Sequence, residues 1–302
     1  MRTFALMNSF ISKDRIGLFV ALGYLLLCFV LIIAESGQSV QMPSDAKAIG
    51  IYKIWQVITA TVLFIAPVTV FCRYLRPERN AFLNMGSIPH LYFLITAAAC
   101  IIFAIPAVEG LGQWNAGIHL PSAFSATEKW MHREENAAEK VYLAFFQDKS
   151  TFGLVINLLV MGLVAALSEE LFFRGLLQQI FIKNKINAHV AIVLTAILFS
   201  AFHMQFFGFL PRLFLGIVLG YLYYITQNLW VSIAAHFINN AFLIVQVHLY
   251  SDEIEAVAAK PAGEQSGIGI AFVLLSLALV AAQLIFLQRF INRIKMPPTN
   301  YE

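Results

Sequence analysis

The stretch STFGLVINLLVMGLVAALSEELFFRGLLQQIFIK at residues 150–183 decides the fold of this protein. Before Lys183 its only charged residues are Glu169, Glu170 and Arg174. At 1.5 Å per residue, a helix of this length crosses a hydrocarbon core of about 30 Å. We therefore predict a membrane-spanning helix that carries charges at membrane depth.

Further apolar runs surround this stretch, at residues 16–34, 54–72, 88–108, 188–206, 207–225, 229–249 and 267–287. The chain of 302 residues is 60% hydrophobic and only 12% charged, whereas about a quarter of the residues of a soluble domain are charged. This composition excludes a water-soluble globule. It predicts an all-α protein, a polytopic membrane bundle of about eight transmembrane helices.

The basic residues gather on one side of this predicted bundle. Eleven Lys and Arg residues against three acidic residues give that side a net charge of +8, and the opposite side carries −4. Because basic residues are enriched in cytoplasmic loops, we expect both termini in the cytoplasm and a bacterial inner membrane as the location. The total charge of +3 is too small to indicate a nucleic-acid partner.

The segments predicted outside the membrane carry weaker signals. Residues 125–128 read Ser-Ala-Thr-Glu, a capping-box pattern, and an imperfect amphipathic helix follows with Trp130, Ala137 and Val141 on one face. We expect this helix to lie in the outer interface rather than to act as a lid. Residues 252–266 are predicted to form an exposed loop. Three cysteines in or next to apolar runs predict inert packing residues and no disulfide: Cys28, Cys72 and Cys100.

Ionisable residues at membrane depth are the functional signal, because each costs several kcal/mol unless it is paired or faces a cavity. One such group consists of Glu169, Glu170, Arg174, His203 and His236, together with the polar pair Asn239 and Asn240. Counted along three helices, Glu169, the two histidines and Asn240 fall about 14 to 24 Å from the basic side. These residues are therefore predicted to share one layer. By contrast, Arg212 is expected to extend towards the interface.

Within this layer, Glu170 and Arg174 have the i,i+4 spacing of a helical ion pair. Glu169 points about 100° away around the helix, so it is left to face a cavity as a general base. His203 follows Phe199 by four residues, and Asn240 follows His236 by four, so each pair presents one helical face. Two histidines and a glutamate can bind zinc, or activate a water and stabilise an oxyanion directly; the spacing does not choose between these chemistries.

Other catalytic patterns are absent from the sequence. It contains no His-Glu-x-x-His, no Gly-x-Ser-x-Gly and no glycine-rich phosphate loop, so zincin, serine hydrolase and nucleotide-binding functions have no support. Gly216-x-x-x-Gly220 predicts close packing of helices.

The polar motifs resemble those of the CPBP family, which comprises CAAX prenyl proteases and bacteriocin-processing membrane proteases related to the Ras-converting CAAX endopeptidase. The resemblance rests on three motifs in the same order: Glu169-Glu170-Leu-Phe-Phe-Arg174, Phe199-Ser-Ala-Phe-His203 and His236-Phe-Ile-Asn-Asn240. It covers about a third of the chain. It divides the sequence into residues 1–149 with three spans and the outer segment, a catalytic core at 150–249, and 250–302 with the last span and a basic tail.

The resemblance implies an intramembrane endopeptidase whose site is reached from the cytoplasmic side. It assigns water activation to Glu169 with His203, oxyanion stabilisation to His236 with Asn240, and support to Glu170 and Arg174. A zinc ion held by Glu169, His203 and His236 and a metal-free glutamate mechanism both fit these residues. The implied partners are membrane lipids and a membrane-associated protein or peptide, with or without a lipid anchor. The alternatives are a non-catalytic immunity or scaffold protein, or a small ion transporter.

Overall fold

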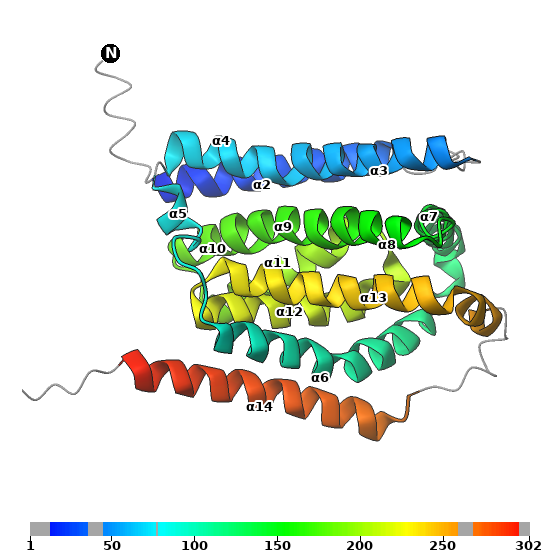
Figure 1. The fold of residues 1–302 in the computed structure, drawn as a ribbon. Helices are drawn as coiled ribbons and strands as arrows, with labels where there is room; N and C mark the ends of the chain where they lie inside the picture. The colour runs from blue at the N-terminus through cyan, green and yellow to red at the C-terminus, as the bar shows by residue number, and fades with distance from the viewer. Residues whose placement is uncertain (1–12, 36–44, 77, 259–267, 296–302) are drawn as a thin grey trace, which may run out of the picture.

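The structure is a computed structural model that describes residues 13–35, 45–76, 78–258 and 268–295 (Figure 1). The described residues form helices and connecting turns, with no strand, as the sequence predicts. The elements in chain order are α2 (Lys13–Glu35), α3 (Ala46–Ala60), η1 (Thr61–Ile65), α4 (Ala66–Leu75), α5 (Arg79–Phe82), α6 (Leu91–Ala116), η2 (Ser122–Phe124), α7 (Ser125–Ala144), α8 (Thr151–Asn157), η3 (Leu158–Val164), α9 (Ala165–Glu170), η4 (Leu171–Gln178), α10 (Gln179–Lys183), α11 (Ala188–Phe202), η5 (Phe206–Gly208), α12 (Phe209–Thr226), α13 (Leu229–Ala258) and α14 (Ile270–Lys295).

Seven helical stretches in the described part of the chain are long and apolar enough to cross a membrane. The remaining predicted span, residues 188–206, is shorter than expected: α11 ends at Phe202, and its 15 residues rise only about 22 Å. His203 caps α11, and Met204 takes a left-handed backbone conformation with φ 54°, which stops the helix. The protein is thus a multi-pass membrane protein with a short α11–α12 hairpin at its centre.

The helices form three layers (Figure 1). One outer layer holds α2 with α3 and α4, and the other holds α6 with α14. The central layer contains α8 to α13. Both α2 and α14 have their terminal ends at the same end of the bundle, which we call the basic end. Its described basic residues are Arg15, Arg73, Arg76, Arg79, Lys183, Lys185, Arg289 and Arg293.

Two expectations about the segments between spans are wrong. The predicted capping box does not form, since α7 begins at Ser125 after Phe124 and Glu128 pairs instead with His119 at 3.0 Å. The expected loop at 252–266 is partly helical, because α13 continues past a kink at Tyr250 to Ala258. Glu and Ala residues favour this continuation. Residues 259–267 lie outside the described part of the chain.

Close packing of α11 against α12 follows from the two predicted glycines. A Cβ atom on Gly216 would lie 3.0 Å from Ala196 Cβ, and one on Gly220 would lie 2.9 Å from Ile192 Cγ2. The carbonyl oxygens of these glycines also accept hydrogen bonds from the fourth span, Thr151–Lys183: Gly216 from Arg174 Nη2 at 3.0 Å, and Gly220 from Gln178 Nε2 at 3.1 Å. The glycines therefore bring three elements together at the level of the polar residues.

We predict that Gly220→Ala destabilises the protein, because the added methyl group would overlap both Ile192 and Gln178 Oε1. Overpacking of this kind costs about 1 to 3 kcal/mol. The measurement is thermal unfolding in detergent. Gly23→Ala is the matched control, since a Cβ there meets nothing within 4 Å. Equal melting temperatures for the two variants would contradict the packing role of Gly220.

Candidate active site

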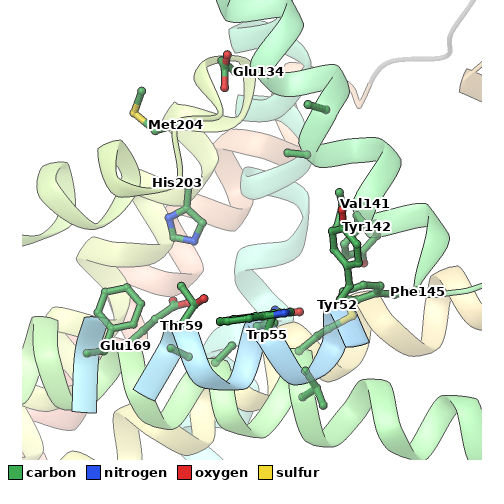
Figure 2. Close-up of a pocket in the computed structure, with 18 residues that line it drawn as sticks. Tyr52, Trp55, Thr59, Glu134, Val141, Tyr142, Phe145, Glu169, His203 and Met204 are labelled. Carbon is green, nitrogen blue, oxygen red and sulfur yellow. The ribbon is translucent and has the colours of Figure 1, made fainter. Parts of the chain in front are cut away.

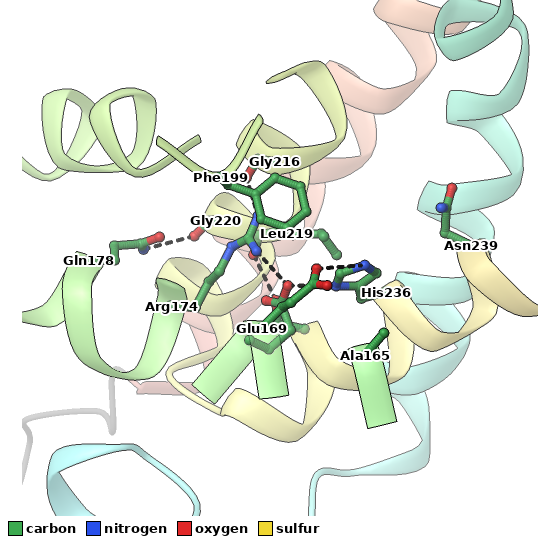
Figure 3. A network of polar contacts seen from close by, with 12 residues as sticks. Ala165, Glu169, Arg174, Gln178, Phe199, Gly216, Leu219, Gly220, His236 and Asn239 are labelled. Atoms are coloured by element: carbon green, nitrogen blue, oxygen red, sulfur yellow. Dashed lines mark hydrogen bonds and ion pairs between the residues drawn. The ribbon is translucent and has the colours of Figure 1, made fainter. Parts of the chain in front are cut away.

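Glu170 is the centre of a buried polar network, and Figure 3 labels two of its partners, Arg174 and His236. Its carboxylate has no exposed surface and accepts hydrogen bonds from Arg174 Nη1 at 2.5 Å, Ser232 Oγ at 2.5 Å and His236 Nδ1 at 2.9 Å. The predicted Glu170–Arg174 ion pair is therefore present. Ser232 is a member of the network that sequence reasoning missed, because a serine in an apolar helix gives no specific signal.

The Arg174 side chain is buried and contacts three neighbouring residues. It has no exposed surface, and its guanidinium lies over the Phe199 ring at 4.6 Å as well as bonding Glu170 and Gly216. Because buried charges are tolerated only when they are paired and hydrogen-bonded, Arg174 and Glu170 compensate each other. Both side chains are fully buried away from the cavity, which fits the supporting role predicted for them.

Glu169 lies on a different side of the helix from its neighbour. Its side chain keeps 16% of its surface exposed, against none for Glu170, and it lines a cavity. Its Oε2 is 3.8 Å from His236 Nε2. Since His236 bonds Glu170 through Nδ1, its Nε2 is the ring nitrogen directed towards Glu169. Glu169 and Glu170 thus lie on either side of His236. Glu170 fixes the orientation of the imidazole ring, and Glu169 faces the cavity.

His203 lines the same cavity from the C-terminal end of α11 (Figure 2). Its Nδ1 donates to Phe199 carbonyl oxygen at 2.9 Å, which leaves Nε2 free. The spacing of Phe199 and His203 that the sequence singled out therefore fixes the orientation of the ring. No direct bond joins His203 to Glu169 in the described structure, so the cavity separates the two groups.

The cavity has a volume of about 610 Å³. Its walls come from α3, α7, the fourth span and the loop at His203, and they are mainly apolar and aromatic, including Tyr52, Trp55, Phe64, Val141 and Tyr142 (Figure 2). Burial raises the pKa of Tyr142 to about 12, so its phenol is neutral at physiological pH. The space between Glu169 and His203 can therefore accept an apolar chain.

The outer helix α7 is a wall of this cavity, and not only a helix of the interface as expected. Its residues Glu134, Ala137, Ala138 and Val141 line the space. At its C-terminal end, Phe145 carbonyl oxygen accepts from Lys53 Nζ at 3.2 Å and Asn157 Nδ2 at 2.9 Å. These two bonds fix the C-terminal end of α7 to α3 and α8.

The loop after His203 is tied to both α7 and α12. Glu135 Oε2 accepts from Phe207 N at 3.3 Å, and the His132 ring stacks on the Phe207 ring at 4.3 Å. Arg212 bonds Gln205 Oε1 at 2.8 Å and also its backbone oxygen. The expectation that Arg212 extends to the interface is therefore wrong, because the loop offers it two acceptors nearby.

Asn240 lies one helical turn beyond His236 and beside the cavity. Its Nδ2 donates to Met161 carbonyl oxygen at 3.3 Å, and its Oδ1 accepts from Asn239. Met161 is a cavity residue, whereas Asn240 and His236 are not among the residues that line it. The structure thus brings Glu169 and His236 together, places His203 across the cavity, and leaves Asn240 behind its wall.

The predicted zinc ligands do not form a three-ligand set as they stand. Within the described ranges, no three His, Cys, Asp or Glu side chains lie close enough together to hold a metal ion. Glu169 and His236 are neighbours, but His203 stands apart. Because structural and catalytic zinc sites need at least three protein ligands, the placement of these side chains does not fit zinc.

The fold is that of a multi-pass membrane protein with its polar residues at the centre, and the comparison with family models agrees. Residues 151–242 match the family described as type II CAAX prenyl endopeptidase Rce1-like. The match covers about a third of the chain, agrees with the resemblance to the CPBP proteases and supports a membrane protease in general. Comparisons with curated proteins and with solved structures found no match.

The network predicts different effects for the two adjacent glutamates. Glu170→Gln leaves the buried Arg174 without its anionic partner, which costs about 3 to 5 kcal/mol, so we expect a large fall in thermal stability. Glu169→Gln is the matched variant, and it should melt close to the native protein because it breaks no buried pair. Detergent melting curves measure both. A stability loss of similar size in Glu169→Gln would contradict the separation of roles.

Proposed function

We propose that this protein is an intramembrane endopeptidase that cleaves a peptide bond in the cavity at Glu169. The observation that carries the proposal is the contrast between the two glutamates: Glu170 is saturated by three donors, and Glu169 faces the cavity beside His236. An unsaturated carboxylate at this depth is costly for the fold, which favours a functional reason for it. The family match supports the same class of reaction.

In the proposed mechanism, a water beside Glu169 gives a proton to its carboxylate as the water oxygen bonds to the peptide carbonyl carbon. The tetrahedral oxyanion is stabilised by an Nε2–H of a protonated histidine, either His203 or His236. The carbon–nitrogen bond then breaks, and Glu169 passes its proton to the leaving amine. Asn240 lies behind the cavity wall, so its proposed role is to hold that wall through its bond to Met161 carbonyl oxygen. This mechanism involves no metal ion.

The proposed substrate is a membrane-associated protein or peptide. The apolar and aromatic walls around Glu169 suit an extended chain with apolar side chains. The name of the matched family describes prenylated CAAX proteins, and whether this chain requires a lipid anchor on its substrate is part of the proposal to be tested. Both described ends of the chain lie at the basic end, which supports the proposal that both termini are cytoplasmic.

We predict that Glu169→Gln lowers cleavage by about 10²- to 10⁴-fold, the usual contribution of a general base. Membranes from cells that lack the protein are complemented with the native protein or with this variant, and new protein termini are compared by mass spectrometry. The expected result is a set of termini that appears only with the native protein. Identical termini, together with a phenotype retained by Glu169→Gln, would instead favour the immunity or scaffold function.

The metal-free mechanism makes a separate prediction about the purified protein. We expect it to contain much less than one zinc per chain and to keep its activity in a chelator, because His203 stands apart from the other two candidate ligands. Elemental analysis and a cleavage assay measure this. Stoichiometric zinc that is lost in His203→Ala would contradict the metal-free mechanism and assign the ion to Glu169, His203 and His236.

A further inference from the structure

The cavity lies towards one end of the bundle, and its position bears on how a substrate reaches it. Counted from Lys183 at the basic end, Glu169 lies about 21 Å into the membrane. On the second span, counted from Leu75, Thr59 lies at about 24 Å and Trp55 at about 30 Å. The cavity thus extends from Glu169 away from the basic end, to the far boundary of a hydrocarbon core of about 30 Å.

Towards the basic end, the way to Glu169 is blocked by a packed apolar core. Phe173 and Leu177, which follow Glu169 in the direction of Lys183, have no exposed surface. The Phe173 ring packs against Phe199 at 5.3 Å and against Phe202 at 6.0 Å. Protein interiors of this kind hold few voids larger than a water molecule, so a polypeptide chain cannot pass through this core.

The side of the bundle next to α2 is closed as well. A groove of about 550 Å³ runs between α2 and α4, but it ends at Tyr24 and Phe172 and does not include Glu169. The Phe172 ring packs on Tyr24 at 5.9 Å and on Phe64 at 5.7 Å. Tyr24 Oη also donates to Leu63 carbonyl oxygen at 2.8 Å. This aromatic wall separates the groove from the cavity.

Between α3 and α7 the cavity has exposed walls. Trp55 is 60% exposed, and Thr59, one turn nearer to Glu169, is also exposed. The helix α7 is held at its C-terminal end by Lys53 and Asn157 and near its middle, at Glu135, by the Phe207 loop. The part of α7 between these two contacts lines the cavity. Figure 2 shows Trp55 and Thr59 on α3 facing the open space beneath α7.

We propose that the substrate reaches Glu169 through this gap between α3 and α7, from the end of the bundle opposite the basic end. The inference rests on the proposed protease function. The sequence-based expectations place both the basic end and the entrance to the site on the cytoplasmic side. In this structure the basic end and the proposed entrance lie at opposite ends of the bundle, so these two expectations exclude each other. If the positive-inside rule holds here, the entrance is extracytoplasmic.

The same geometry defines the substrate segment. It is a stretch of polypeptide that leaves the membrane at the end opposite the basic end and carries apolar side chains around the scissile bond. Trp55, Tyr142 and Phe64 supply the apolar contacts. The Glu169 carboxylate lines this cavity, so an acidic side chain beside the scissile bond is disfavoured.

Cysteine labelling tests the entrance without depending on catalysis. Cys28, Cys72 and Cys100 are buried and are replaced by alanine, and single cysteines are introduced as Thr59→Cys in the gap and Arg79→Cys at the basic end. A membrane-impermeant maleimide is applied to right-side-out and to inverted vesicles. We expect Thr59→Cys and Arg79→Cys to react from opposite sides. Reaction from the same side, or no reaction of Thr59→Cys from either side, would overturn the proposal.

A second readout connects the gap to cleavage. Lys129→Cys is the matched control, because Lys129 is exposed on α7 but does not line the cavity. The bulky label should abolish most cleavage by Thr59→Cys and little of that by Lys129→Cys, each compared with its own unlabelled activity. Full activity after complete labelling of Thr59→Cys would show that substrate enters elsewhere. If Glu169→Gln proves active, the protease function fails while the labelling result still stands.

Discussion

The buried carboxylate of Glu170 is the group on which the rest of the site depends. It joins the fourth span to α13 through Ser232 and His236, and through Arg174 it reaches the backbone of α12 at Gly216. A carboxylate without exposed surface requires this many donors, because each unpaired buried charge is costly. The three helices are thereby fixed in one register, and the ring of His236 is fixed in one orientation.

This constraint explains why two adjacent glutamates differ so much. Consecutive helical residues point about 100° apart, so only one of them can enter the network. Glu170 enters it, and Glu169 is turned to the cavity at the edge of the same network. The arrangement follows a common pattern in enzymes, in which one group orients a histidine and another group next to that histidine meets the substrate.

The short α11–α12 hairpin has a comparable effect on the scale of the whole bundle. Since α11 ends at Phe202, this arm of the hairpin leaves part of the membrane thickness unfilled, and α7 covers that space. Gly216 and Gly220 let α12 pack closely on α11, and their carbonyl oxygens accept hydrogen bonds from Arg174 and Gln178 of the fourth span. The cavity therefore forms because α11 is short and α7 covers the space beyond the C-terminal end of α11.

Much of this protein was determined by its sequence alone. Apolar runs predicted the helices, since backbone groups in a bilayer must be satisfied within each segment, and the i,i+4 spacing predicted the Glu170–Arg174 pair. The family resemblance came from three local motifs. Tertiary structure decided what no local pattern encodes: that Ser232 joins the network, that Arg212 turns back to Gln205, that His203 stands apart from Glu169, and that α7 roofs the cavity. These features depend on contacts between residues far apart in the chain, and only the packed bundle brings such residues within reach of one another.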